Sequence, residues 1–145
     1  MEFRLHPQLE RDSLPITTLP LSEVRLINDS QYPWVILVPR VPDISECIDL
    51  SAELQQMLFW ESSYICQMLR TVFKPDKLNV AAIGNMVPQL HLHHIARYKQ
   101  DAGWPKPVWG QLPMQAYSSD EARQCIYKIE QYFQHNNFDQ YKENR

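Results

Sequence analysis

Three of the five histidines in this chain fall within four consecutive positions, as His91, His93 and His94. Alternate side chains of an extended chain point to opposite faces, so a strand here would carry His91 and His93 on one face, with Gln89 beside them. His94 would then lie on the reverse face. Imidazole titrates near neutral pH and acts as a base, nucleophile or metal ligand. The spacing therefore predicts a reactive strand face within residues 89–98.

The residues alone leave three uses of this histidine pair open: nucleophilic catalysis, metal binding and a purely structural role. A His-x-His pair can chelate zinc, but a catalytic zinc normally takes a third protein ligand. Neither the cysteines nor His6 or His135 stands at a recognisable ligand spacing. Two hydrogen-bonded imidazoles in a half-buried sheet are the structural alternative. We favour chemistry at phosphorus or carbon, with no metal and no cofactor, and interpret His94 as structural.

The elements that position the histidines are predicted to be both strands and helices. Residues 34–38 form a continuous, mostly β-branched run between two prolines, which is typical of a buried strand. Residues 19–27 alternate roughly and predict another strand. The proline-rich residues 3–26 indicate short elements joined by rigid corners. Residues 77–83 are also extended in pattern and should pair with the histidine strand as a hairpin.

Two helices are also predicted, one between strands 34–38 and 77–83 and one after the histidine strand. Apolar residues recur at three- and four-residue steps from a cap at Asp49 or Ser51 to Phe73, and Pro75 prevents continuation. A capping box at Ser118 starts a second amphipathic helix, over about residues 119–136. The polar residues beyond it are expected to fray.

Length and composition limit the class of protein. A chain of 145 residues with 44% hydrophobic residues fits one domain, residues 1–145, with its core in about 3–110. No apolar run approaches the ~20 residues of a membrane span, and no signal peptide is recognised. The net charge of −3 includes no basic stripe, which argues against nucleic-acid polymers as partners.

The three cysteines, Cys47, Cys66 and Cys125, are widely separated and lie in apolar contexts. This distribution is typical of reduced, buried thiols rather than a disulfide framework. Together with the absence of a targeting signal, it leads us to expect a cytoplasmic protein.

The run Gln89-Leu90-His91-Leu92-His93-His94-Ile95 resembles the signature His-φ-His-φ-His-φ-φ, where φ is apolar, of the histidine-triad (HIT) superfamily of nucleotide hydrolases and transferases. Gln89 stands where the first histidine is expected, and His94 replaces an apolar residue. Residues 78–88 resemble the family's lead-in, and residues 26–40 its ribose-binding residue and apolar strand. The segment ending in Trp104-Pro-Lys-Pro-Val-Trp-Gly110 resembles a bacterial branch often labelled diadenosine tetraphosphate hydrolase-like.

The resemblance implies an α+β fold, with an antiparallel sheet of about five strands, a long packed helix and an appended C-terminal helix. It implies that His91 attacks the α-phosphorus of a nucleotide and forms a nucleotidyl-histidine, which water then cleaves. We expect the second ring nitrogen of His91 to donate to a main-chain carbonyl. His93 would stabilise the developing charge. Gln89 can donate a hydrogen bond but cannot deliver a proton, which favours a good leaving group, as in diadenosine tetraphosphate.

Further roles follow from the same resemblance. Asn28 or Asp29 would bind the ribose, and Asn79 and Asn85 would contact phosphate or orient the catalytic face. The alternative for each of these residues is a structural role in a turn. Apolar residues near the first strands, Phe3, Leu5 and Ile27, would contact the base. Trp104 and Trp109 either close over the site or pack against the core. Family members are usually homodimers through a helix and a sheet edge, so a homodimer is expected.

The sequence leaves two other functions open. A protein with glutamine in place of the first histidine is conceivable as a binding module that holds a nucleotide without turnover. A metal-dependent hydrolase using His91, His93 and an unseen third ligand is the other alternative.

Overall fold

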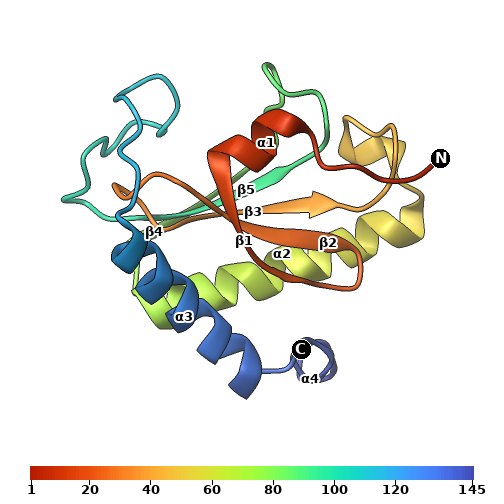
Figure 1. The fold of residues 1–145 in the computed structure, drawn as a ribbon. Helices are drawn as coiled ribbons and strands as arrows, with labels where there is room; N and C mark the ends of the chain where they lie inside the picture. The colour runs from red at the N-terminus through yellow and green to blue at the C-terminus, as the bar shows by residue number, and fades with distance from the viewer.

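A computed structural model describes all residues from Met1 to Arg145. Its centre is an antiparallel sheet in the order β1-β2-β3-β5-β4 (Figure 1). The strands are β1 (Ser13–Thr18), β2 (Ser22–Ile27), β3 (Trp34–Pro39), β4 (Lys77–Ala81) and β5 (Leu92–Arg97). The helices are α1 (Pro7–Asp12), α2 (Ala52–Phe73), α3 (Ser119–His135) and α4 (Phe138–Glu143), with a 3₁₀ turn η1 (Cys47–Asp49). The predicted α+β fold is confirmed.

The helix α2 covers one face of the sheet. Ser51 caps its first turn by accepting from the N–H of Leu54, and Lys74 ends it in the left-handed region ahead of Pro75. The larger hydrophobic core lies between α2 and the sheet, and includes Val35 and Leu37 of β3. In Figure 1, α2, α3 and α4 all lie on this side of the sheet, while α1 lies on the other.

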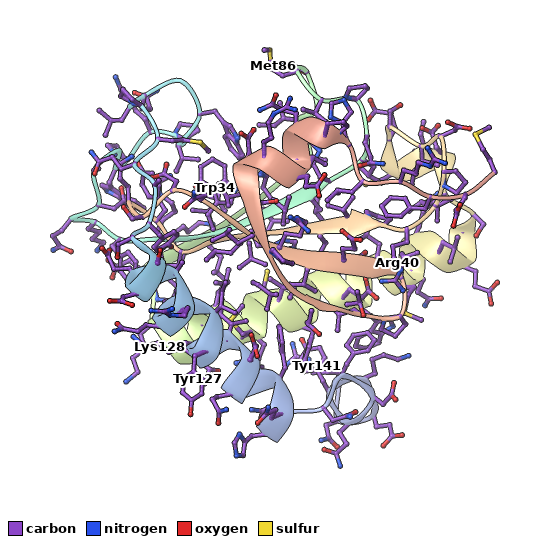
Figure 2. All side chains as sticks on the ribbon, in the orientation of Figure 1. Trp34, Arg40, Met86, Tyr127, Lys128 and Tyr141 are labelled. Carbon is purple, nitrogen blue, oxygen red and sulfur yellow. The ribbon has the colours of Figure 1, made fainter.

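The opposite face of the sheet carries a second, smaller core. Alternation along β3 sends Trp34, Ile36 and Val38 to this side, where they pack with Ile95 of β5. The short helix α1 contributes Leu9, and the loop after β4 contributes Val87. In Figure 2, Trp34 lies close to α1, and Tyr141 of α4 lies well below the sheet.

The predicted histidine strand is shorter than expected. It begins at Leu92 rather than Gln89, and β4 and β5 pair only from Ala81 opposite His93 onward. Pro88 has no N–H to give to a ladder, and the N–H of Leu90 donates to Ile44 outside the sheet. Residues 89–91 therefore lead into β5 from a loop. The predicted hairpin of β4 and β5 is confirmed.

The polar C-terminal tail folds, so the expectation that it frays is wrong. Asn137 caps α4, and Phe138 is buried against Tyr64 of α2. Tyr141 packs edge-on against Trp60. The aromatic residues spaced along this short polar segment supply enough apolar area to hold it on α2.

Two further expectations concern the N-terminal region and the cysteines. Residues 3–26 form α1, β1 and the start of β2, and β1 tolerates Pro15 because it is an edge strand with an irregularity after that residue. All three cysteines are free; Cys125 is buried, whereas Cys47 and Cys66 are partly exposed. None of the helices combines the length and the apolarity that crossing a membrane requires.

Candidate functional site

The imidazole rings of His91 and His93 lie side by side on the face of the sheet that α2 does not cover. Their centroids are 4.8 Å apart and their planes are inclined at 71°. Only 7% of His91 and 6% of His93 is exposed. His93 lies on β5 and pairs with Ile36 of β3. His91 is the last loop residue before β5, which begins at Leu92. The sequence prediction that these two histidines share a face is confirmed.

The tautomer of His91 is fixed by the main chain. Its Nδ1 lies 2.8 Å from the carbonyl oxygen of Gln89, which can only accept, so Nδ1 carries the proton. The expected main-chain partner of His91 is thus confirmed. Burial lowers the pKa of His91, the Gln89 bond opposes this, and the nearby His6 lowers it further. His91 therefore presents an unprotonated Nε2 at neutral pH.

The tautomer of His93 is fixed in the opposite sense. The indole N–H of Trp34 donates to Nδ1 of His93 across 2.9 Å, so the neutral ring carries its proton on Nε2. Burial, reinforced by His91 and His94, lowers the pKa of His93 to about 3. Trp109 packs edge-on against the same ring, with centroids 5.0 Å apart. His93 is therefore a neutral hydrogen-bond donor on Nε2, next to the unprotonated Nε2 of His91.

Gln89 is turned toward the N-terminal segment. Its Oε1 accepts from the N–H of His6 and its Nε2 donates to the carbonyl of Arg4, both across 2.9 Å. Gln89 lies in the loop before β5, so the expectation that it belongs to the histidine strand is wrong, and its amide pairs with the backbone of residues 4–6. An open pocket of about 390 Å³ adjoins it and is also lined by Arg4 and Asp43.

The two residues predicted for ribose binding lie at the end of β2 and hold a distant segment. Oδ1 of Asn28 accepts from the N–H of Tyr117 across 3.0 Å. Oδ1 of the buried Asp29 accepts from the N–H groups of Gln31 and Gln115. The second carboxylate oxygen of Asp29, Oδ2, takes part in none of these bonds. Asn28 therefore holds the distant segment at Tyr117, whereas Asp29 both closes a local turn at Gln31 and holds Gln115.

The structure separates the two asparagines predicted ahead of the histidines. Asn79 lies on β4 opposite Ile95, and its Oδ1 accepts from Nη1 of Arg97 across 2.9 Å. Arg97 is buried and paired with Asp101 at 2.8 Å. Asn79 is thus tied to the C-terminal end of β5. Asn85 is instead exposed, in the loop between β4 and β5, and its side chain makes no hydrogen bond.

His94 lies on the opposite face and is fully buried beneath α2. Its Nε2 is 2.8 Å from Oγ of Ser62, and its Nδ1 is 3.3 Å from the carbonyl of Val35. Burial lowers the pKa of His94 to about 4, against the raising effect of its backbone hydrogen bonds. These contacts agree with the structural role expected for it.

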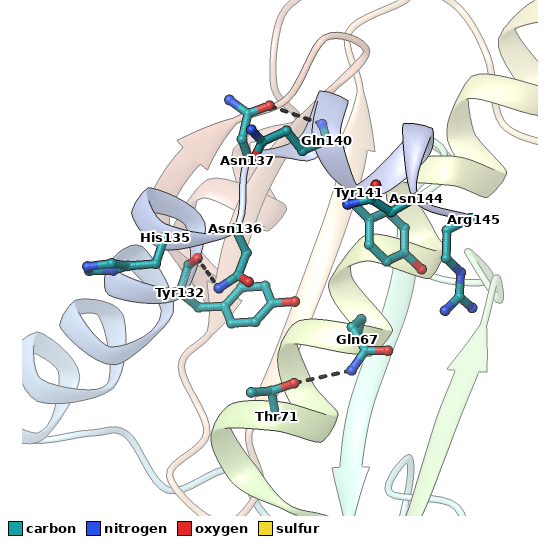
Figure 3. Close-up of a pocket in the computed structure, with 10 residues that line it drawn as sticks. All are labelled: Gln67, Thr71, Tyr132, His135, Asn136, Asn137, Gln140, Tyr141, Asn144 and Arg145. Atoms are coloured by element: carbon teal, nitrogen blue, oxygen red, sulfur yellow. Dashed lines mark hydrogen bonds between the residues drawn. The ribbon is translucent and has the colours of Figure 1, made fainter.

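No set of three His, Cys, Asp or Glu side chains is arranged to hold a metal ion. A polar pocket of about 400 Å³ lies elsewhere, between α2 and the two C-terminal helices (Figure 3). Its one imidazole, His135, bonds back to the carbonyl of Gln131 on its own helix. This pocket has no second imidazole beside His135, whereas His91 and His93 lie ring to ring, so that pair is the candidate site.

Sequence reasoning missed two residues beside the histidine pair, His6 and Trp34, and left the place of Trp109 open; Trp109 packs on His93. The apolar run at residues 34–38 predicts only a buried strand for Trp34, because it does not reveal that the indole N–H of Trp34 faces an imidazole. A tryptophan entering a strand next to the histidine strand is the signal that was present, since a buried indole N–H needs an acceptor. His6 carried no signal at all, because 83 residues separate it from Gln89.

Solved structures of similar proteins share this fold. The HIT domain family model matches residues 8–100. A histidine triad protein from Bradyrhizobium japonicum is 45% identical, with 90% of this chain and 98% of that chain covered and a TM-score of 0.88. A histidine triad protein from Marinobacter aquaeolei VT8 is 44% identical, with 93% of this chain and 98% of that chain covered and a TM-score of 0.90. One from Sinorhizobium meliloti 1021 is 41% identical, with 89% of this chain and 96% of that chain covered and a TM-score of 0.87. No curated protein matches. The chain belongs to the HIT domain family of histidine triad proteins.

Proposed function

We propose that this protein is a nucleotide phosphohydrolase or nucleotidyl transferase that acts at the α-phosphorus through His91, with a dinucleoside polyphosphate such as diadenosine tetraphosphate as substrate. Family membership supports a nucleotide-binding or hydrolase-type function. The observation that carries the proposal is the pair of opposite tautomers: a bare Nε2 on His91 beside an Nε2–H on His93. One ring is arranged to attack, and the other to donate to the oxygen on which charge builds.

The proposed reaction has two steps. In the first, the lone pair of His91 Nε2 forms a bond to the α-phosphorus, and the bond from phosphorus to the leaving oxygen breaks with its electron pair. In the second, a water oxygen bonds to phosphorus and releases a proton to solvent, while the phosphorus–nitrogen bond breaks and restores the lone pair. The His93 Nε2–H would donate to a non-bridging oxygen in both steps. Two smaller barriers replace one large barrier.

The leaving group is the basis for the proposed substrate class. Gln89 has no acidic proton, and both of its bonds in the structure go to backbone atoms of residues 4–6. A polyphosphate leaves as an anion and needs little protonation, whereas an amine or alkoxide needs an acid, whose loss costs about 100- to 10,000-fold. We therefore favour polyphosphate leaving groups.

The roles proposed for the nucleotide-binding residues rest on atoms left free. Oδ2 of Asp29, at the end of β2 beside Asn28, takes part in none of the bonds made by Oδ1 and would accept from a ribose hydroxyl. The unpartnered amide of Asn85 is available to phosphate, and Asn79 would act by orienting the end of β5. The smaller core includes the partly buried Phe3 and Leu5 and the buried Ile27, which form an apolar surface for a base. Such surfaces discriminate weakly among purines.

We also propose a homodimer. The strand β4 is an open edge of the sheet and presents the exposed Val80, while Phe59 of α2 is 72% exposed. An apolar helix position and an unpaired strand edge are both covered when two copies associate. Sedimentation should give a dimer for the wild type and a monomer for Phe59→Glu. A wild-type monomer at high concentration would refute the proposal.

We also propose a cytoplasmic location. All three thiols are free, as expected in a reducing compartment. Recovery of the protein from an oxidising compartment would contradict this location.

The proposal is tested with purified protein, diadenosine tetraphosphate and a metal chelator. Products should form in the presence of chelator and should disappear in His91→Ala. Activity that is lost with chelator and restored by zinc would favour a metal-dependent hydrolase. Tight nucleotide binding without turnover, for several leaving groups, would favour a binding module. The Gln89 amide, which bonds to backbone atoms and has no acidic proton, is consistent with that alternative.

A further inference from the structure

His6 lies immediately before α1, outside the residues matched by the family model. It is nevertheless connected to the catalytic histidine through a single residue. The N–H of His6 donates to the side chain of Gln89, and the carbonyl of the same Gln89 accepts from His91. Gln89 thus sets the position of both histidines, which meet at this residue from distant parts of the chain.

The orientation of the His6 ring is also fixed. The N–H of Gln8 donates to its Nδ1 across 3.0 Å, so that His6 caps α1. Because an acceptor nitrogen has no proton, the neutral ring carries its proton on Nε2. His6 is only partly buried, so this N–H remains accessible to a ligand. After burial, His6 also contributes to the lowered pKa of His91, so the two side chains are within electrostatic range of each other.

We propose that His6 is a third imidazole of the active site and that its Nε2–H binds the phosphate oxygens of the leaving group. This inference rests on the proposed function. His6 reaches the site through Gln89, two residues before His91, and His93 lies two residues after His91, on β5. In this arrangement Gln89 contributes mainly by holding His6.

In-line displacement explains why such a donor need not touch His91. The leaving oxygen departs on the side of phosphorus opposite the attacking nitrogen, so the group that binds it lies about one phosphoryl group away. A neutral N–H suffices there, because a polyphosphate departs without taking up a proton. The guanidinium of Arg4, in the pocket beside Gln89, adds positive charge on the same side, with Glu2 and Asp43 as negative neighbours.

The test separates the ring donor from the helix cap. In His6→Asn, the asparagine oxygen caps α1 in place of Nδ1, and the backbone N–H to Gln89 is kept, but no donor extends as far as Nε2. His6→Ala removes both functions. The matched control is His135→Asn, an exposed histidine at the end of α3. Thermal unfolding of each variant shows whether α1 is retained.

Two substrates with the same adenylyl group and different leaving groups give the decisive readout: diadenosine tetraphosphate and the p-nitrophenyl ester of AMP. The nitrophenolate has no phosphate for His6 to bind. His6→Asn should lower kcat/KM about 10- to 100-fold for the tetraphosphate, as for loss of a hydrogen bond to a charged group, and less than about threefold for the ester. His135→Asn should leave both unchanged.

Equal losses on the two substrates, or none, would overturn the role of His6 while leaving the function of His91 intact. A wild-type protein that turns over neither substrate would overturn the proposed function and this inference with it. A loss confined to the tetraphosphate, in a variant with wild-type unfolding temperature, would support the inference.

Discussion

Trp34 donates its indole N–H to Nδ1 of His93 from the adjacent strand β3, and this bond decides which nitrogen of His93 faces the site. Without it the imidazole could carry its proton on either nitrogen, and only one tautomer presents a donor to a phosphoryl oxygen. The bond also explains a buried polar pair within an apolar cluster, because each group satisfies the other.

Trp34→Phe should therefore reduce turnover while preserving most of the packing. Loss of a neutral hydrogen bond is worth about 1 kcal/mol, so we expect kcat to fall about 3- to 10-fold with a smaller change in KM. Nitrogen NMR of the histidines should show mixed tautomers at His93 in this variant. Trp60→Phe, between α2 and α4, is the control and should match wild type. Unchanged kcat and an unchanged His93 tautomer in Trp34→Phe would refute this role.

The pH dependence of kcat/KM follows from the lowered pKa of both site histidines. A histidine with a depressed pKa stays neutral as the pH falls through the ordinary value of about 6.5. Activity should therefore hold from about pH 8 to below about pH 6.5, and fall only when His91 is protonated. An acid limb centred at or above about pH 6.5 would show that His91 is not desolvated as the structure indicates.

His94 should affect stability rather than chemistry. Its pKa of about 4 in the folded protein is below the ordinary value, so on acidification the unfolded chain takes up a proton that the folded chain refuses. Stability should thus fall as the pH drops from about 6.5 to about 4. His94→Gln should lose about 1–3 kcal/mol of unfolding free energy at neutral pH and show a shallower decline in acid. Urea unfolding at two pH values measures both.

The control for this experiment is His135→Gln, which should reproduce the wild-type free energy at each pH because His135 is exposed. His93 is also buried with a lowered pKa, so part of the acid sensitivity should persist in His94→Gln. An identical acid slope in His94→Gln and wild type would mean that His94 does not contribute to it.

Asp29→Asn tests the proposed ribose contact. The variant keeps an oxygen at Oδ1 for the N–H groups of Gln31 and Gln115 and replaces Oδ2 by a donor. KM should rise about tenfold for a ribonucleotide substrate, the effect of losing one charged hydrogen bond, and stay nearly constant for an analogue without ribose hydroxyls. Equal changes for the two substrates would restrict Asp29 to its structural role.

Local sequence patterns predicted the main elements and the histidine face for identifiable reasons. Residues 34–38 and α2 carry strong periodicities, and Ser51 and Ser118 carry capping signals, all of which depend on neighbours in the sequence. The same holds for His91 and His93, whose two-residue spacing needs only an extended chain. Predictions failed where a residue distant in the sequence decides the local structure. Leu90 is expected in the histidine strand, but its N–H donates to Ile44 outside the sheet. The C-terminal tail is expected to fray, but Phe138 packs against Tyr64.

The same limit applies to the details of the site. The resemblance placed Gln89 at the first triad position, but its hydrogen bonds go to the N-terminal segment, whose approach depends on the packing of Leu9 and the other residues of the smaller core. The tautomer of His93 likewise depends on Trp34, on a different strand. Hydrogen-bond partners that are far apart in the sequence are not encoded in local pattern, so these features required the fold.

The central claim is that Nε2 of His91 forms a covalent bond to the α-phosphorus. Mass spectrometry of intact His93→Ala protein, quenched during turnover of diadenosine tetraphosphate, measures this most directly. We predict a mass increase of one adenylyl group, located at His91 by peptide mapping and absent when His91 is also replaced. Turnover by the wild-type enzyme with no adduct in any quenched sample, or an adduct on another residue, would contradict the account.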